Sequence, residues 1–498
     1  MPTLGWASLA GYFALMLGIG FYAWRKAKAD AEGYMLGGRD LGPGVTALSA
    51  GASDMSGWLL MGLPGAIFAD GLAAAWIGIG LTLGAWANYH LVAPRLRTFT
   101  ELAGDAITIP DFLEERFADD SRLLRVIAAV VIILFFTLYC SAGMVAGGKF
   151  AEAALDLPYL QGVALATVVV VIYVLFGGFL AVSLTDFVQG CIMFAGLVIV
   201  PIVVVLELGG FAGTSAALAA AEEGRGLLPG TLTSLFTGTT LLGIISTAAW
   251  GLGYFGQPHI IVRFMAIRRV EDLPIARRIN IGWMAISLAG AIATGLLGAA
   301  WAANGGEAPG DPETIFILFA KILFHPLMTG FLLAAILAAI MSTISSQLLV
   351  TASSLAEDIW RGVIRRDASE SSVVAIGRAA VLLVSAVSAL LAMNPDSSIL
   401  NLVSNAWAGF GAAFGPLILF ALHWRGTTRW GALAGMVTGA AVVIGWIAAG
   451  WSAAMYEIVP GFLAASLAIW LVSKITAKVP EDRLVLFGQA AEAARAGR

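Results

Sequence analysis

Long apolar runs separated by short polar or charged segments fill almost the whole chain. Each run approaches the roughly 20 residues that an α-helix needs to cross the hydrocarbon core of a bilayer. The pattern predicts thirteen transmembrane helices, at 4–24, 42–67, 71–93, 123–148, 158–181, 186–207, 236–262, 279–302, 328–356, 373–393, 397–422, 429–450 and 454–474. A further apolar stretch, 313–324, is too short to cross, and we expect an extramembrane or re-entrant helix there. The predicted fold class is an all-α polytopic membrane protein.

The composition fits a membrane protein and excludes an ordinary soluble domain. Of the 498 residues, 59% are hydrophobic and 12% are charged, whereas soluble domains carry about 25% charged residues. A net charge of −4 without a basic block gives no reason to expect a nucleic-acid partner. The first apolar run has neither a positive n-region nor a small-residue cleavage site, so we expect a retained helix and not a signal peptide. The predicted location is the plasma (bacterial inner) membrane, crossed many times.

The distribution of lysine and arginine over the predicted loops indicates the orientation. Cytoplasmic loops of membrane proteins are enriched in these residues. One set of alternate loops contains Arg25, Lys26, Lys28, Arg39, Arg95, Arg97, Arg116, Arg122, Arg125, Arg263, Arg268, Arg269, Arg277, Arg278, Arg361, Arg365, Arg366, Arg425 and Arg429. The opposite set contains Lys149, Arg225 and Lys321. We therefore predict that the N-terminus is outside and the C-terminus inside, an arrangement that requires an odd number of spans.

Two of the predicted spans contain residues that weaken a helix. The stretch "LSAGASDMSGWLLMGLPG", residues 48–65, carries a carboxylate, Asp54, together with several glycines and a proline, and we expect an interruption near 52–57. Five helices later, "WGLGYFGQPH" at 250–259 combines three glycines with a proline. Interrupted helices at matching positions of two halves indicate an inverted-repeat transporter whose site lies at the bilayer midplane. The alternative is that glycine and proline are simply frequent in membrane helices.

This interpretation divides the chain into one membrane domain and a tail. Residues 1–475 form a single transmembrane transporter domain, and 476–498 form a short cytoplasmic tail. Within the domain we expect an extra N-terminal helix, two five-helix repeats made of helices 2–6 and 7–11, and two C-terminal helices, over 4–24, 42–207, 236–422 and 429–474.

The ninth predicted span has a polar middle. Hydroxyl and amide side chains occur there at Ser342, Thr343, Ser345, Ser346 and Gln347. Oxygen ligands suit a hard cation, and carbonyls freed by the break in helix 2 could complete its shell. The alternative is that these side chains bond to their own helix or to neighbouring helices.

Long motifs in these same regions resemble the sodium/solute symporter family. The matching segments are "GGRDLGPGVTALSAGASDMSGWLLMGLPG" (37–65), "TIPDFLEERF" (108–117), "GGFLAVSLTD" (177–186), "WGLGYFGQPHIIVRFMA" (250–266) and "LAAIMSTISSQLL" (337–349). Within the family they are most similar to the bacterial members that carry proline with sodium. The resemblance extends from about residue 5 to 475, and it implies thirteen helices, an extracellular N-terminus and a LeuT-type core of two inverted five-helix repeats.

The resemblance also implies a sodium site between helices 2 and 9. The implied ligands are the main-chain carbonyls of Ala52, Met55 and Ala339 and the hydroxyls of Ser342 and Thr343. Two acids match functional carboxylates of the family. Asp54 would support the sodium site, and Asp186 would assist the passage of sodium toward the cytoplasm.

A substrate pocket is implied by a second set of matches. Its members are Ser56, Gly57, Trp58, Tyr139, Trp250, Tyr254 and Pro258. Trp250 and Tyr254 are four residues apart, so they share one helix face and could enclose an apolar ring. Such a pair could also belong to an interfacial aromatic belt.

The predicted function is sodium-coupled symport of L-proline into the cell, with sodium as the co-transported ion and no enzymatic activity. Another small solute, such as a different amino acid, a sugar or pantothenate, remains an alternative, as does coupling to protons through Asp54. A membrane sensor is a further alternative, but only about 24 residues follow the last span. Arg39 is either a gate residue near helix 2 or a positive-inside anchor. A monomer suffices for this function, and the sequence leaves the oligomeric state open.

Overall fold

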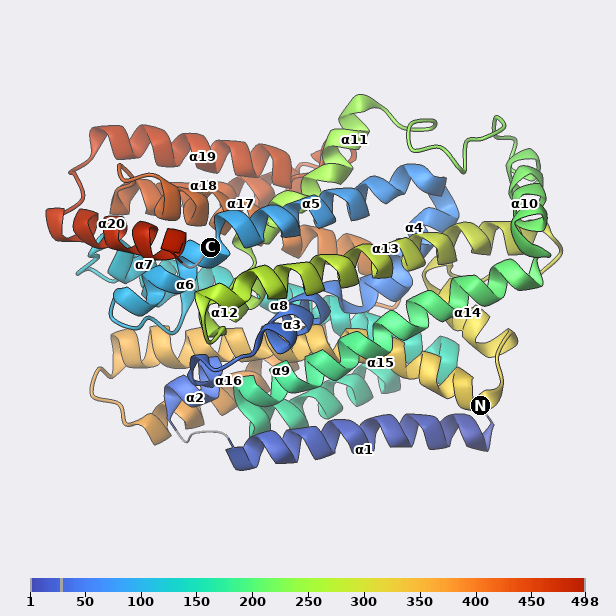
Figure 1. Cartoon of the computed structure of the whole chain (residues 1–498), viewed down its shortest axis with the longest axis horizontal. Helices are drawn as coiled ribbons and strands as arrows, with labels where there is room; N and C mark the ends of the chain where they lie inside the picture. The colour runs from blue at the N-terminus through green and yellow to red at the C-terminus, as the bar shows by residue number, and fades with distance from the viewer. Residues whose placement is uncertain (1, 27–29, 497–498) are drawn as a thin grey trace.

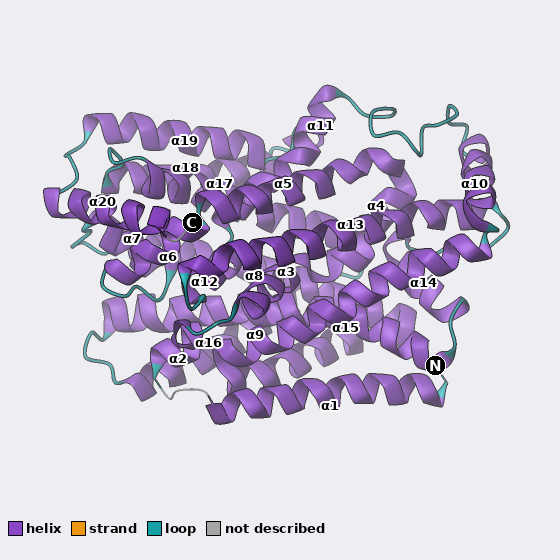
Figure 2. Cartoon of the chain, in the orientation of Figure 1, coloured by secondary structure: helices purple, strands orange, loops and turns teal. Residues whose placement is uncertain are grey.

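The computed structural model describes residues 2–26 and 30–496, and this part of the chain is helical with short connections (Figure 2). No strand occurs within these residues; the only β-type pairing in them is a single bridge between Leu41 and Ile267. The long helices run roughly along a common axis, and the loops gather at the two ends of the bundle (Figure 1). Lys28, which contributed to the predicted orientation, lies outside the described residues.

The α-helices are α1 Thr3–Lys26, α2 Ala31–Leu36, α3 Pro43–Gly57, α4 Leu63–Asp70, α5 Trp76–Leu91, α6 Ala93–Leu102, α7 Ile109–Phe117, α8 Leu123–Leu155, α9 Tyr159–Glu207, α10 Gly210–Gly224, α11 Leu241–Ala248, α12 Pro258–Ala266, α13 Leu273–Ala303, α14 Ile315–Ile322, α15 Pro326–Ser353, α16 Glu370–Leu391, α17 Ile399–His423, α18 Arg429–Ala448, α19 Ile458–Ile475 and α20 Glu481–Ala496. Short 3₁₀ or π segments are η1 Gly37–Arg39, η2 Trp58–Gly62, η3 Gly71–Ala75, η4 Ala249–Gly256, η5 Val270–Asp272, η6 Pro312–Thr314, η7 Ser354–Ile364 and η8 Trp451–Ala453.

These helices agree with the predicted apolar spans. Ten helices in the described part of the chain are long and apolar enough to cross a membrane, and one of them, Pro43–Leu102, covers two predicted spans. Two shorter apolar helices, Tyr159–Ile172 and Leu241–Gly256, fall at the predicted spans 158–181 and 236–262. The all-α membrane fold is confirmed, while the count of thirteen and the orientation of the termini stay predictions.

The structure differs from the sequence pattern in several connections. The turn between the fifth and sixth predicted spans lies at Gly178 and not at 182–185, and Gly178 has the positive φ of 56° that favours glycine. A Cβ at this position would also lie 2.9 Å from Tyr34. The predicted connector 208–235 contains α10, and the predicted tail contains α20. The apolar pattern does not predict these two short helices, because they are stabilised by packing on the bundle.

The centre of the bundle is built around α15 and α17. In their most apolar stretches, 78% of the α15 residues and 83% of the α17 residues are buried, against 22% for α1, so α1 lies at the periphery. α15 packs against α3, α8 and α9. Alanine and serine on α15 permit this close approach, because small side chains let helix backbones come together. The polar middle of α15 is thereby placed directly against α3.

Candidate functional site

The second predicted span is broken where its glycine-rich segment predicts a break. α3 loses helical geometry at Ser56, whose φ of 33° and ψ of −171° lie outside the helical range. The chain continues as the π-helical segment η2 before α4 begins. The freed N–H of Ser56 donates to Oγ1 of Thr343 on α15, over 3.0 Å. A polar side chain of α15 therefore satisfies the backbone at the break, as buried membrane backbone requires.

The oxygen atoms predicted as sodium ligands lie on facing turns of α3 and α15. The Ser342 hydroxyl is 2.8 Å from the carbonyl oxygen of Ala52 and 3.1 Å from that of Ala339. Thr343 contacts α3 one turn further along. Its Oγ1 accepts a hydrogen bond from the N–H of Ser56, and the carbonyl of Met55 belongs to the same peptide group. All five residues are buried. Carbonyl and hydroxyl oxygens in this arrangement form a donor set that suits a hard monovalent or divalent cation.

Asp54 joins the two broken spans. Its side chain is 1% exposed, and its Oδ2 accepts a hydrogen bond from the hydroxyl of Tyr254 on η4. Its Oδ1 has no hydrogen-bond partner among the described residues. A buried carboxylate with an unsatisfied oxygen is costly within a membrane protein. Stability does not explain Asp54, so the residue points to a functional role beside the break.

The seventh predicted span is interrupted as well. It consists of α11, the 3₁₀ segment η4, the extended residue Gln257 and then α12, which begins at Pro258. Two of its glycines are required by close packing: a Cβ on Gly251 would lie 2.2 Å from a carbonyl oxygen of α5, and one on Gly253 would lie 1.9 Å from Trp407. The glycines therefore bring η4 into contact with α5 and α17.

An aromatic cluster surrounds this second break. It comprises Trp58, Trp250, Tyr254, Trp407 and Tyr456. The ring of Trp250 lies 5.9 Å from Trp58, 6.4 Å from Trp407 and 5.4 Å from Tyr456, and Tyr254 lies 5.3 Å from Trp407. The indole N–H of Trp407 donates to the Trp250 carbonyl over 2.8 Å. The sequence prediction missed Trp407 and Tyr456, although Trp407 stands in a glycine-rich segment that could have drawn attention.

The other predicted substrate residues lie in different surroundings. Tyr139 on α8 is buried, its hydroxyl has no hydrogen-bond partner among the described residues, and its ring lies 6.1 Å from that of His259. Gly57 is a packing position, because a Cβ there would lie 2.9 Å from Ala146. Pro258 lines a separate small cavity. The structure thus brings Ser56, Trp58, Trp250 and Tyr254 together, places Tyr139 beside His259, and leaves Gly57 and Pro258 outside the cluster.

A buried ion pair lies close to the cation-type donor set. Oδ2 of Asp186 accepts hydrogen bonds from Ser49 at 2.8 Å and from Ser346 at 3.3 Å, and it is 3.3 Å from Nη2 of Arg263. Arg263 also donates to Ser49, to Ser346 at 2.5 Å and to the carbonyl of His259. Both charged side chains are 0% exposed. This network connects α3, α9, α12 and α15.

The position of Arg263 corrects its treatment as a loop residue. The sequence pattern places Arg263 among the basic residues of a cytoplasmic loop, but in the structure it lies inside α12 and is fully buried. An arginine near the end of an apolar run looks like a loop residue in sequence, because only the tertiary fold supplies its partner on α9. The remaining basic residues of that connection still support the predicted orientation.

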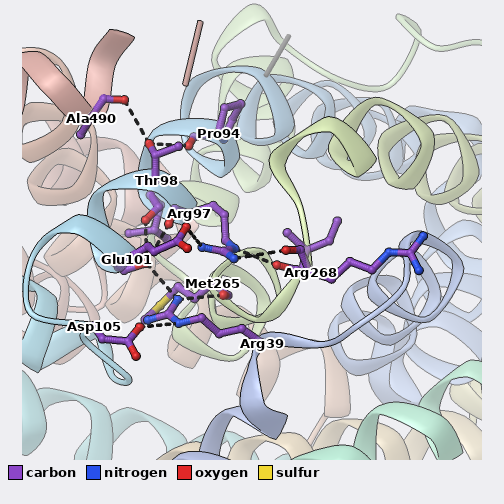
Figure 3. A network of polar contacts seen from close by, with 12 residues as sticks. Arg39, Pro94, Arg97, Thr98, Glu101, Asp105, Met265, Arg268 and Ala490 are labelled. Carbon is purple, nitrogen blue, oxygen red and sulfur yellow. Dashed lines mark hydrogen bonds and ion pairs between the residues drawn. The ribbon is translucent and has the colours of Figure 1, made fainter. Parts of the chain in front are cut away.

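A polar network joins η1 and α6 to the end of α12 (Figure 3). Arg39 donates to Asp105 at 2.8 Å and to the carbonyls of Ala106 at 2.7 Å and Met265 at 2.9 Å. Burial lowers the pKa of Arg39, and the nearby Asp105 opposes that shift. Arg97 donates to the carbonyl of Ile267 at 2.7 Å. These contacts tie the α6–α7 connection to the end of α12.

The fold and the site together define a LeuT-type secondary transporter: a helical membrane bundle in which two broken helices meet at a buried, oxygen-lined centre. A profile of the sodium:solute symporter family matches residues 34–439. The chain belongs to that family.

Relatives and a solved structure agree with this assignment. An osmoregulated proline transporter of Bacillus subtilis is 56% identical over 97% of this chain and 96% of its own length. A high-affinity proline transporter of the same organism is 57% identical over 93% of this chain and 96% of its own length. A sodium/proline symporter of Staphylococcus aureus is 53% identical over 94% of this chain and 92% of its own length. The structure of a Na⁺-coupled sialic acid symporter has the same fold, with a TM-score of 0.80 and 19% identity over 96% of this chain and 99% of that one.

Proposed function

We propose that this protein carries L-proline into the cell together with sodium by alternating access. The observation that carries the proposal is the meeting of the α3 break with the hydroxyls of α15, which assembles oxygen donors at a buried site. Proline as the substrate is supported by relatives that are 53–57% identical over nearly the whole chain and are named as proline transporters.

In this proposal sodium binds between α3 and α15. Its ligands are the carbonyls of Ala52, Met55 and Ala339 and the hydroxyls of Ser342 and Thr343. The Ser342 hydroxyl, which donates to Ala52 and Ala339, rotates so that its oxygen lone pairs face the ion. Asp54 supplies the negative charge that offsets the cation in a low-dielectric surrounding, where such attraction is strong.

Proline binds beside the sodium site, against the aromatic cluster. Trp58, Trp250 and Tyr254 offer apolar faces for the pyrrolidine ring. We assign the polar side of this pocket to Ser56 and Tyr139. Since Tyr254 donates to Asp54, a change at either site is transmitted directly to the other. Gly57 and Pro258 contribute indirectly, by fixing the packing of α3 and the start of α12.

Sodium binding then favours closure of the outer side, and movement of the helix bundle opens the inner side. The Arg39 network is the contact that must separate during this inward opening, which favours the interpretation of Arg39 as a gate residue. One charge moving through 100 mV yields about 2.3 kcal/mol, and a tenfold sodium gradient adds about 1.4 kcal/mol. At one sodium per proline, the sum of about 3.7 kcal/mol supports roughly 500-fold accumulation.

Radiolabelled L-proline uptake into proteoliposomes tests this proposal. We expect uptake under an inward sodium gradient, no uptake under an equal potassium gradient, and competition by unlabelled proline. Uptake driven equally well by a proton gradient without sodium would show that protons are the coupling ion. Sodium-dependent uptake of another solute, with no inhibition by proline, would show that proline is not the substrate.

A further inference from the structure

A cavity unrelated to the central site lies at the end of the bundle that carries α6 and α7. It is lined by His90 at the end of α5, by Pro94 of α6 and by Leu273, Pro274, Arg277 and Arg278 of α13. α5 and α13 run alongside each other toward this end (Figure 1). The cavity therefore sits between two membrane helices, close to the predicted membrane surface.

The cavity is positively charged. Nη1 of Arg277 donates to Nε2 of His90 over 2.7 Å, and the His90 ring lies 4.2 Å from the ring of Trp86. These contacts fix the Arg277 guanidinium at the cavity and use one of its five donors. Arg278 is exposed. In the part of the chain that the structure describes, neither arginine pairs with a carboxylate.

The acidic residues just before α13 do not neutralise this positive charge. Asp272 is engaged by Arg268 at 2.6 Å and by Arg269 at 4.0 Å. The remaining acid, Glu271, is exposed to solvent and offsets one of the two unpaired arginines at most. The arginines at the cavity therefore retain a net positive charge with unused hydrogen-bond donors, which is the chemistry that recognises a phosphate group.

An exposed apolar track leads away from the cavity along the same two helices. On α5, Leu83 is 62% exposed and Trp86 is 51% exposed. On α13, Ile275, Ile279 and Ile286 are 46%, 38% and 49% exposed, and their spacing of four and seven places them on one helix face. A Cβ added to Gly282, on the same stretch, would meet nothing within 4 Å.

We propose that this corner binds an anionic phospholipid, with its phosphate in the cavity at Arg277 and Arg278 and its acyl chains along the track. Basic pockets between membrane helices are suited to such headgroups, and an interfacial tryptophan beside them is typical of the headgroup level. A free phosphate would match the arginines equally well. The apolar track, which begins at the cavity, is the feature that favours a lipid.

The position of this site gives the lipid a route to the transport machinery. α5 packs against η4, and α13 packs against α3 and α4. A lipid that bridges α5 and α13 therefore contacts two helices that support both broken spans. We expect the bound lipid to raise the thermal stability of the protein independently of sodium or proline.

The test is a titration of the purified protein in detergent with phosphatidylglycerol, followed by native mass spectrometry. Phosphatidylcholine and inorganic phosphate form the other two arms. For Arg277→Gln/Arg278→Gln we expect about 30-fold weaker phosphatidylglycerol binding, the size expected for two arginines near a membrane surface. The matched control is Arg365→Gln/Arg366→Gln, which removes the same charge from another connection and should leave binding unchanged.

A second variant tests the apolar track for the acyl chains separately from the phosphate site. Gly282→Trp should block the apolar track and weaken phosphatidylglycerol binding severalfold without altering phosphate binding, whereas Gly18→Trp, at an equally open position on α1, should have no effect. The proposal is overturned if the double arginine variant binds phosphatidylglycerol like wild type, if phosphatidylcholine binds equally well, or if phosphate alone competes fully. Because Gly282→Trp keeps both arginines, it decides the question even if the double variant fails to fold.

Discussion

Asp54 and Asp186 are both fully buried carboxylates, yet their surroundings differ. Asp186 lies 3.3 Å from a guanidinium nitrogen of Arg263 and accepts hydrogen bonds from two serines. Asp54 accepts a hydrogen bond from the neutral Tyr254 hydroxyl, and no salt bridge involves it among the described residues. A compensated carboxylate can persist as part of the structure. An uncompensated one is stabilised when a cation or a proton binds to it, and in the proposed mechanism sodium supplies that charge.

The largest effect should follow from breaking the compensated pair. Arg263→Met leaves Asp186 buried and unpaired, and removal of one partner of a buried pair costs about 3–5 kcal/mol. We expect a strongly lowered free energy of unfolding in detergent. In the double variant Arg263→Met/Asp186→Leu no charge remains to be desolvated, so most of the stability should return. If the two substitutions simply add, the pair is not the source of the effect.

Asp54→Asn should behave in the opposite way. The substitution removes an uncompensated buried charge, so the free energy of unfolding should stay the same or rise. The sodium concentration for half-maximal proline uptake should rise about 100-fold, equivalent to about 2.8 kcal/mol, because the charge that offsets sodium is gone. Uptake kinetics and thermal unfolding of one preparation measure both quantities. Loss of stability together with an unchanged sodium dependence would make Asp54 a structural residue.

A smaller effect is expected from the Ser342 hydroxyl of α15, which contacts the Ala52 carbonyl of α3. Ser342→Ala removes one proposed sodium ligand and should raise the half-saturating sodium concentration about tenfold, near 1.4 kcal/mol. Ser345→Ala is the matched control, since its buried hydroxyl donates to the Ser342 carbonyl over 3.0 Å but lies outside the proposed shell. Equal shifts in the two variants would show that polarity of α15, and not ligation, sets the sodium affinity.

The smallest effect should arise in the aromatic cluster. Trp407→Phe keeps an aromatic ring but loses the hydrogen bond to the Trp250 carbonyl, so proline affinity at saturating sodium should fall by about 0.5–1.5 kcal/mol. Trp76→Phe loses a comparable bond to the Leu235 carbonyl that involves no residue of the cluster and should bind proline normally. Equal affinities in both variants would separate the cluster from the substrate.

The membrane spans and both broken helices could be predicted from the sequence. Apolar run length indicated the spans, and glycine, proline and an acid within single spans indicated both breaks, because these residues conflict with a continuous membrane helix. The partners of Asp54 and Asp186 were less accessible. Arg263 looked like a loop residue, and Trp407 and Tyr456 join the cluster only through packing between distant segments. The turn at Gly178 was missed because the apolar run continues through it.

The decisive experiment for a sodium site at the α3 break is the sodium dependence of proline uptake by Thr343→Ala proteoliposomes, with Thr343→Ser as the conservative variant. The Thr343 hydroxyl both meets the broken backbone at Ser56 and belongs to the proposed sodium shell. We expect Thr343→Ala to need about tenfold more sodium for half-maximal uptake and Thr343→Ser to remain close to wild type. A Thr343→Ala protein that folds and transports proline with unchanged sodium dependence would contradict a sodium site at the α3 break.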